Sequence, residues 1–147
     1  MKLIIAFDPN GGIGYDGKLP WSKIEGDLPR FKELTSGKIV LMGRNTWDSL
    51  PKKPLPNRTN WVMTSRPIDG IKNPDNDTIA KEKEVWLIGG AKMIESYWDF
   101  INEIHVSRTF AEYTCDTFID LVKLEKEFMC WQKEDCADHS YEIWKRK

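Results

Sequence analysis

The chain has 147 residues, of which 40% are hydrophobic and 31% are charged, and its formal net charge is -1. This length favours a single folded domain, residues 1–147, that is large enough to bury a hydrophobic core. The basic residues are dispersed along the chain, which argues against a nucleic-acid partner. No apolar run is long enough to span a bilayer, and the apolar amino terminus is too short for a secretory signal. We therefore expect a cytoplasmic globular protein.

The cysteines and histidines are too few and too scattered for a metal centre. The three cysteines, Cys115, Cys130 and Cys136, form no Cys-x-x-Cys pair, and the two histidines lie in no ligand-spaced cluster. We interpret the cysteines as reduced thiols and expect no metal ligand. We also expect a monomer, because no long exposed apolar stripe calls for a partner.

The first predicted element is a buried strand at Leu3–Phe7, an apolar run that ends abruptly at Asp8-Pro9. The next residues are rich in glycine and other turn formers, which predicts a long loop. Long loops in compact domains are often lids or binding loops. Because this loop ends in the apolar Leu19-Pro20-Trp21, we interpret it as a lid rather than as a plain surface excursion.

A helix is predicted from Asp27 to the Ser36-Gly37 stop signal. At 100° per residue, three apolar side chains fall within about 100° of Asp27: Leu28, Phe31 and Leu34. The charged side chains are expected on the opposite arc: Arg30, Lys32 and Glu33. One alternative is that Asp27 only complements the helix dipole. However, an acid inside an apolar stripe is costly unless a ligand or a polar partner meets it, which favours a functional role.

Three further buried strands are predicted, and each is followed by small or polar residues with a nearby cation. Ile39–Met42 leads into a turn and a short helix, Asn60–Thr64 leads into Ser65-Arg66, and Val85–Ile88 leads into two glycines and a helix over residues 93–100. Helix N-termini bind anions, and ligands of open α/β sheets lie at the carboxyl ends of strands. Each turn alone has a purely structural reading, but three together predict a dinucleotide site, although no Gly-x-Gly-x-x-Gly motif is present.

The remaining chain completes an α/β fold. Residues 78–84 are too short and too charged to assign. Glu103–Thr109 alternates and predicts a strand, and Cys115–Phe118 is expected to be a turn. Residues 128–131 and 140–144 are expected to pair as an antiparallel hairpin. The predicted architecture is a central, mostly parallel, twisted mixed sheet flanked by helices, with this hairpin at its edge.

Six segments of the chain resemble dihydrofolate reductase in order and spacing, and the similarity runs from Met1 to about Phe118. They are Ile13-Gly14, Leu19-Pro20-Trp21, Asp27 with Phe31-Lys32, Met42-Gly43-Arg44-Asn45-Thr46-Trp47, Leu55-Pro56-Asn57-Arg58 and Ile88-Gly89-Gly90-Ala91. One such motif is weak, whereas six in sequence are specific. The resemblance implies a dihydrofolate-reductase-like fold and an NADPH-dependent reduction of 7,8-dihydrofolate to 5,6,7,8-tetrahydrofolate. It also implies a role in one-carbon metabolism and in thymidylate and purine synthesis, and binding of antifolate inhibitors.

The resemblance assigns roles around the substrate. Asp27 would bind the pterin edge and raise the basicity of N5, and Trp21 would help to position the water that delivers the proton. Ser107, where the family usually has threonine, would support Asp27 by a hydrogen bond. Arg58 would bind the glutamate α-carboxylate, a geometry that suits a guanidinium. The other implied substrate-binding residues are Ile4 and Ile88, through their carbonyls, and Leu28, Phe31, Lys32, Leu50 and Leu55.

The resemblance also implies a cofactor site built from the strand ends and the lid. The lid would meet the nicotinamide, the glycine turns would hold the pyrophosphate, and Arg44, Ser65 and Arg66 would receive the 2′-phosphate, which favours NADPH over NADH. The implied cofactor-binding residues are Ala6, Ile13, Gly14, Gly17, Lys18, Leu19, Gly43, Arg44, Asn45, Thr46, Thr64, Ser65, Arg66, Gly89, Gly90, Ala91, Lys92, Met93, Ile94 and Thr117.

The chain departs from the family pattern in ways that bear on the cofactor. The segment between Ser65 and Gly89 is shorter than in typical bacterial members, so the helix there is expected to be curtailed or missing. Ala91 replaces a third glycine, and Ile94 stands where many members have an aromatic residue. Two alternatives stay open: a related pyrimidine reductase, and a non-catalytic nucleotide-binding or structural module on the same fold. Failure to bind antifolates would favour the first, and cofactor binding without dihydrofolate turnover would favour the second.

Overall fold

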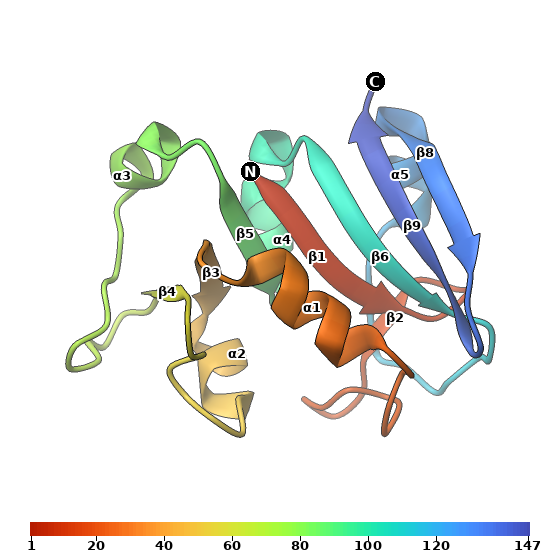
Figure 1. Cartoon of the computed structure of the whole chain (residues 1–147), viewed down its shortest axis with the longest axis horizontal. Helices are drawn as coiled ribbons and strands as arrows, with labels where there is room; N and C mark the ends of the chain where they lie inside the picture. The colour runs from red at the N-terminus through yellow and green to blue at the C-terminus, as the bar shows by residue number, and fades with distance from the viewer.

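The computed structural model describes all 147 residues and has a seven-stranded mixed sheet at its centre, in the order β4-β3-β5-β1-β6-β9-β8 (Figure 1). Its strands are β1 (Lys2–Phe7), β3 (Ile39–Gly43), β4 (Thr59–Met63), β5 (Val85–Gly89), β6 (Glu103–Thr109), β8 (Phe128–Asp135) and β9 (His139–Arg146). Strands β4, β3, β5, β1 and β6 are parallel, whereas β9 runs antiparallel to both β6 and β8. A separate antiparallel pair joins β2 (Gly12–Gly14) to β7 (Thr117–Phe118).

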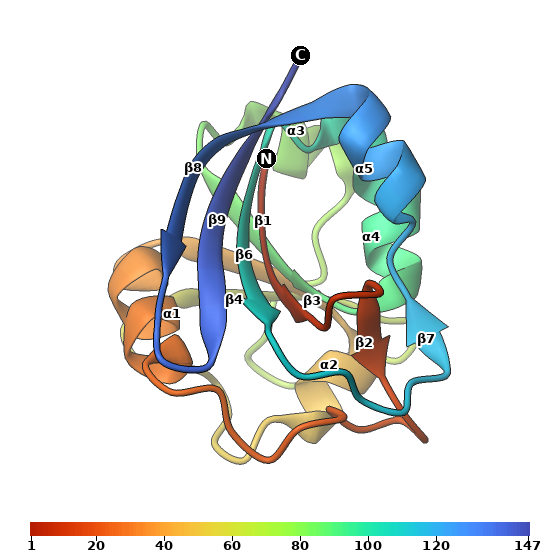
Figure 2. The same cartoon turned by 90° about the vertical axis from the view of Figure 1, so that its right-hand side faces the viewer.

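Helices cover both faces of the sheet. The helix α1 (Asp27–Thr35) lies on one face, and α4 (Ala91–Tyr97) and α5 (Leu121–Glu127) lie on the other (Figure 2). Two helices are shorter: α2 (Arg44–Ser49) follows β3, and α3 (Asn76–Lys81) precedes β5. The 3-10 helix η1 (Trp98–Phe100) extends α4. None of the helices combines the length and the apolar character that crossing a membrane requires.

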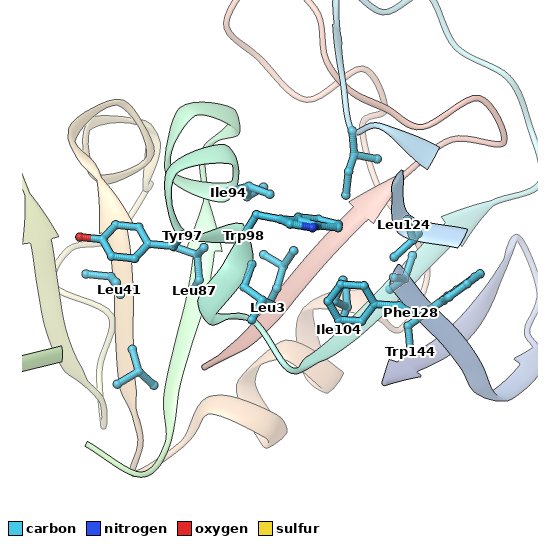
Figure 3. Packing of buried hydrophobic residues seen from close by; sticks show 14 of the residues in the cluster. Leu3, Leu41, Leu87, Ile94, Tyr97, Trp98, Ile104, Leu124, Phe128 and Trp144 are labelled. Atoms are coloured by element: carbon cyan, nitrogen blue, oxygen red, sulfur yellow. The ribbon is translucent and has the colours of Figure 1, made fainter. Parts of the chain in front are cut away.

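The two faces of the sheet carry two separate hydrophobic clusters. In β3, Val40 and Met42 belong to the smaller cluster, which Leu34 of α1 joins, whereas Leu41 belongs to the larger cluster of 17 residues. Successive side chains of a strand point to opposite faces, so one apolar run supplies both clusters. Figure 3 shows the larger cluster, which combines sheet residues such as Leu41 and Leu87 with Tyr97 of α4 and Trp98 of η1. A sheet buried on both faces explains why the strands read as continuous apolar runs.

The predicted architecture is confirmed: the fold is α/β, the sheet is mostly parallel, and an antiparallel hairpin closes the carboxyl-terminal edge. The five predicted parallel strands are present, each within about one residue of its expected bounds. The hairpin strands are longer than predicted, because β8 and β9 continue past the apolar residues into polar ones. The helix predicted after Asp27 is also present.

Several local expectations differ from the structure. The prediction of a turn over Cys115–Phe118 is wrong for its last two residues. Thr117 and Phe118 form β7, which pairs with β2 in the loop after β1. The helix expected over residues 93–100 begins earlier, at Ala91, and tightens to a 3-10 helix at Trp98.

Two short helices were not assigned from the residue pattern, although the resemblance implied a curtailed or missing helix between β4 and β5. The helix α3 spans six residues, so the helix between β4 and β5 is curtailed rather than missing. The helix α5 spans seven residues, which is too short for a clear 3.6-residue period.

Candidate active site

Asp27 and Ser107 form a hydrogen-bonded pair between α1 and β6. The Ser107 hydroxyl donates to Asp27 Oδ1 over 2.6 Å, although the two residues are 80 positions apart in the sequence. The register of the sheet places Ser107 opposite Ala6 of β1. A hydroxyl-to-carboxylate bond of this length is typical of a charge-assisted interaction. The acid in the apolar stripe of α1 therefore has a polar partner.

Apolar side chains of α1 and of the loop before it remain open to solvent. Leu28 is 71% exposed although it follows Asp27 directly in α1, and Leu19 of the preceding loop is 66% exposed. Phe31 is half-buried one turn further along the helix. A carboxylate beside exposed apolar side chains suits a ligand with a polar edge and an apolar body.

Arg58 is held near the carboxyl end of α1. Its Nη1 donates to Thr35 Oγ1 at 3.2 Å and its Nε donates to the Pro56 carbonyl at 2.8 Å. Its guanidinium carbon lies 5.7 Å from the centre of the Phe31 ring. Burial lowers the pKa of Arg58 from its ordinary value, but arginine stays protonated in proteins. The side chain is therefore an oriented cation with N–H groups left for a carboxylate.

A buried aspartate ties the loop after β1 to the loop after β6. Asp8 is only 1% exposed, and its Oδ1 accepts the backbone N–H groups of Asn10 at 2.9 Å and Gly12 at 2.8 Å. Its Oδ2 accepts the N–H of Tyr113 at 3.1 Å. The Tyr113 ring in turn packs edge-on against the buried Trp21, with 5.6 Å between ring centres. One carboxylate thus organises the base of the predicted lid and the support of Trp21.

Arg44 links the ends of β3 and β4. Its Nε pairs with Asp48 Oδ1 at 3.1 Å, and its Nη1 donates to Thr64 Oγ1 at 3.4 Å and to the Arg66 carbonyl at 3.2 Å. The carboxyl ends of these parallel strands lie at the same edge of the sheet, as the sequence predicted.

The end of β5 meets the same edge at Thr46 of α2. Gly89 has φ +137°, a conformation that residues with a side chain rarely adopt, and its peptide bond to Gly90 is cis. A Cβ atom at Gly89 would lie 3.2 Å from Thr46 Oγ1, and one at Gly90 would lie 3.5 Å from it. The glycines therefore bring the backbone of β5 close to α2, and a side chain at Gly89 would press on Thr46, whereas a Cβ atom at Gly90 would make ordinary van der Waals contact with it.

The sequence model of the dihydrofolate reductase family matches residues 1–145. The chain belongs to the dihydrofolate reductase family. It is similar to the dihydrofolate reductase type 8 of Escherichia coli, with 35% identity over an alignment of 163 positions that covers 100% of this chain and 96% of that protein. It is also 37% identical to the dihydrofolate reductase of Buchnera aphidicola, over 84% of this chain and 81% of that protein. The dihydrofolate reductase of Ureaplasma parvum is 33% identical over 95% of this chain and 92% of its own length. The chain is therefore an oxidoreductase of this type, acting on a small-molecule substrate.

The predicted substrate residues of this reductase come from four elements and one loop. They are Ile4 of β1, Asp27, Leu28, Phe31 and Lys32 of α1, Ile88 of β5, Ser107 of β6, and Leu50, Leu55 and Arg58 between α2 and β4. Ile4, Ile88, Leu50 and Leu55 all pack against the smaller hydrophobic cluster, on the α1 face of the sheet.

The residues predicted for the cofactor lie at the strand ends, in the turns that follow them and in the lid. Ala6, Gly43 and Gly89 end or nearly end β1, β3 and β5, and Asn45, Thr46, Ala91, Lys92 and Met93 open α2 and α4. Ile13, Gly14 and Thr117 belong to the β2–β7 pair, with Gly14 opposite Thr117, while Gly17, Lys18 and Leu19 continue the lid. Thr64, Ser65, Arg66 and Gly90 follow β4 and β5. Ile94 differs from the others, because its side chain is buried in the larger core cluster.

One placement made from the sequence is wrong. Arg30 was expected on the outer arc of α1, but it is half-buried and donates hydrogen bonds to Ser107 and to His139 of β9. Three residues after Asp27, position 30 lies only about 60° from the aspartate around the helix. The prediction followed the charge of the side chain rather than its angle.

Sequence reasoning also missed residues that support the site. Asp8 carried a recognisable signal, because an Asp-Pro-Asn-Gly run favours an aspartate that caps its own turn. His139 and Tyr141 carried none, since only the pairing of β6 with β9 brings them to Ser107.

Proposed function

We propose that this enzyme catalyses the NADPH-dependent reduction of 7,8-dihydrofolate to 5,6,7,8-tetrahydrofolate. The observation that carries the proposal is the Asp27 carboxylate, which accepts one hydrogen bond from Ser107 and is flanked by the exposed Leu28. A carboxylate has about four acceptor positions on its two oxygens, so those not used by Ser107 remain for the 2-amino and N3 groups of a pterin.

In this proposal, Asp27 orients the pterin and makes its N5 more basic. A negative charge near the ring favours a cationic N5, because an opposite charge favours the protonated form of a base. Water delivers the proton to N5, and Trp21 helps to position that water. The packing of Trp21 against Tyr113 supports this role, since it limits the positions that the indole ring can take.

The residues at the strand ends suit NADPH. The turn at Gly89 and Gly90 has no side chain facing Thr46, so pyrophosphate oxygens could approach backbone N–H groups there. Asn45, Thr46 and the turn up to Lys92 would hold the pyrophosphate. Arg44, Ser65 and Arg66 would hold the 2′-phosphate, and the contacts of Arg44 to Asp48 and Thr64 would orient its guanidinium. When bound, NADPH supplies the hydride that pteridine C6 receives.

Arg58 would bind the α-carboxylate of the glutamate tail. Its contacts with Thr35, Pro56 and the Phe31 ring reduce the rotamer freedom that binding would otherwise remove. The enzyme would then be a cytoplasmic, single-domain monomer that supplies tetrahydrofolate for one-carbon metabolism and for thymidylate and purine synthesis, and a target of antifolates.

The test measures NADPH oxidation with dihydrofolate as substrate, in the wild type and in Asp27→Asn. The readout is the loss of nicotinamide absorbance. We expect turnover by the wild type and a loss of roughly a hundredfold in the variant at neutral pH, as is typical when a catalytic acid–base group is removed. Asp99→Asn, at an exposed position of η1, is the matched control and should keep wild-type activity.

Other outcomes separate the competing functions. A wild type that binds NADPH but leaves dihydrofolate unreduced would exclude this substrate, and turnover of a ribitylated pyrimidine would then identify a pyrimidine reductase. If Asp27→Asn and the wild type are equally active, the enzyme keeps its reaction and Asp27 loses the role proposed for it.

A further inference from the structure

Arg30 connects Ser107 to the carboxyl-terminal hairpin. Its Nη1 donates to Ser107 Oγ and to His139 Nε2, both over 3.1 Å, and its Nη2 contacts Cys136 Sγ at 3.7 Å. Its guanidinium carbon lies 4.2 Å from the centre of the Tyr141 ring. Stacking on an aromatic ring and several directed N–H bonds together hold a guanidinium in one orientation.

The donors and acceptors of this network can be assigned without ambiguity. Arginine only donates, so Ser107 Oγ accepts from Arg30, and the single O–H of Ser107 is left to donate to Asp27. In the same way His139 Nε2 accepts from Arg30, which leaves Nδ1–H to donate to Asp138 Oδ1 at 2.8 Å. Arg30 thus determines which way the Ser107 hydroxyl points.

The acidic end of the network is also held in place. The backbone N–H of Glu25, followed by the hydrogen bond from His139, lowers the pKa of Asp138 from its ordinary value. Asp138 therefore stays an acceptor for the Nδ1–H of His139 at neutral pH.

We propose that Arg30 is a positioning residue for the reductase reaction, acting through Ser107 on Asp27. Arg30 forms no direct ion pair with Asp27, so its cation acts from one hydrogen bond further away. It has two effects: it turns the Ser107 hydroxyl toward Asp27, and it places a positive charge one hydrogen bond away from that carboxylate. The inference rests on the proposed function only in taking Asp27 as the group that binds the substrate.

A change of Arg30 should move the pH dependence of the reaction in a defined direction. Loss of a nearby cation disfavours the carboxylate anion, so the proton is held to a higher pH and the midpoint of the pH–rate profile rises. Other charged or titratable groups also face this network and stay unchanged in the comparison. They are Glu33 of α1, Glu103 and His105 of β6, Glu134 of β8, Cys136 and Asp138 of the hairpin turn, and His139 and Tyr141 of β9.

The experiment compares the pH profiles of kcat and KM for Arg30→Met, Arg30→Lys and the wild type, with NADPH and dihydrofolate as substrates. For Arg30→Met we expect kcat to fall about tenfold, KM to change less, and the midpoint to rise by about half a pH unit or more. Arg30→Lys keeps the cation and should return the midpoint toward the wild-type value, while kcat recovers only in part because the planar fork is lost.

Arg146→Gln is the matched control. Arg146 also stacks on an aromatic ring, 4.4 Å from the centre of Phe128, and donates to the carbonyls of Trp98 and Ile101, away from the Asp27 site. Its loss should lower the stability of the fold without moving the pH midpoint. If Arg30→Met does not fold, Arg30→Gln serves in its place, because glutamine keeps one N–H donor and removes the charge.

The results separate this inference from the proposed function. The role of Arg30 is overturned, and the proposed function is kept, if the wild type is active and two results hold for Arg30→Met. Its pH midpoint is not shifted, and its loss of kcat is no greater than that of Arg146→Gln. A wild type that does not reduce dihydrofolate overturns the proposed function instead. The Asp27 carboxyl titration, followed by carbon-13 NMR in the wild type and in Arg30→Met, then decides the inference: a higher midpoint in the variant supports it, and equal midpoints overturn it.

Discussion

Replacing Asp8 by asparagine tests whether one buried carboxylate holds together the two loops beside the active site. In the wild type the carboxylate accepts three backbone N–H groups, those of Asn10, Gly12 and Tyr113. Asparagine can keep its oxygen toward Asn10 and Gly12, but its NH2 group then faces the N–H of Tyr113. The variant loses one charge-assisted hydrogen bond and places two donors against each other.

The expected cost follows from the strength of such a bond. Losing a hydrogen bond to a charged group costs about 1.5–3 kcal/mol. With a urea slope of about 2 kcal/mol per molar, the midpoint of unfolding should fall by roughly 1 M while the slope stays the same. A domain with about 5–15 kcal/mol of stability remains folded after such a loss, so the effect can be measured at equilibrium.

Urea unfolding followed by tryptophan fluorescence is the assay, since the chain has seven tryptophans. Asp99→Asn removes an exposed carboxylate and should leave the midpoint unchanged. An Asp8→Asn midpoint equal to that of the wild type would refute the reasoning, because it would mean that the three N–H groups find equal partners without the charge.

Two further predictions concern pH and the cofactor. Burial lowers the pKa of His105 below its ordinary 6.5, against the opposing effect of Glu103. As the pH falls, the His105 side chain therefore takes up its proton in the unfolded state before it does so in the folded state. The stability of the wild type should fall as the pH drops below about 6.5. The urea midpoint of His105→Gln should depend less on pH over the same range. Gly89→Ala places a Cβ atom against Thr46 at φ +137°; we expect NADPH to bind at least about tenfold more weakly by fluorescence titration, and unchanged binding would refute the glycine turn as a cofactor contact.

The sequence alone determined the class of the fold and singled out Asp27 as the candidate for the centre of the site. Four strands could be predicted because a strand buried on both faces is a continuous apolar run, and glycine and proline mark its ends. The fifth, Glu103–Thr109, could be predicted because its apolar and polar residues alternate. Asp27 stood out because it shares a helical stripe with Leu28 and Phe31. These features depend on neighbours within about one helical turn or one strand, so a local pattern is enough to reveal them.

The tertiary structure alone decided what surrounds Asp27. Arg30 reaches Ser107 across 77 positions of the chain and His139 across 109. These contacts depend on the register of β6 with β9, which sets Ser107 opposite Tyr141. A shift of one residue would turn each of these side chains to the other face of the sheet. No local pattern encodes that register, because it is set by the packing of whole strands and helices against one another.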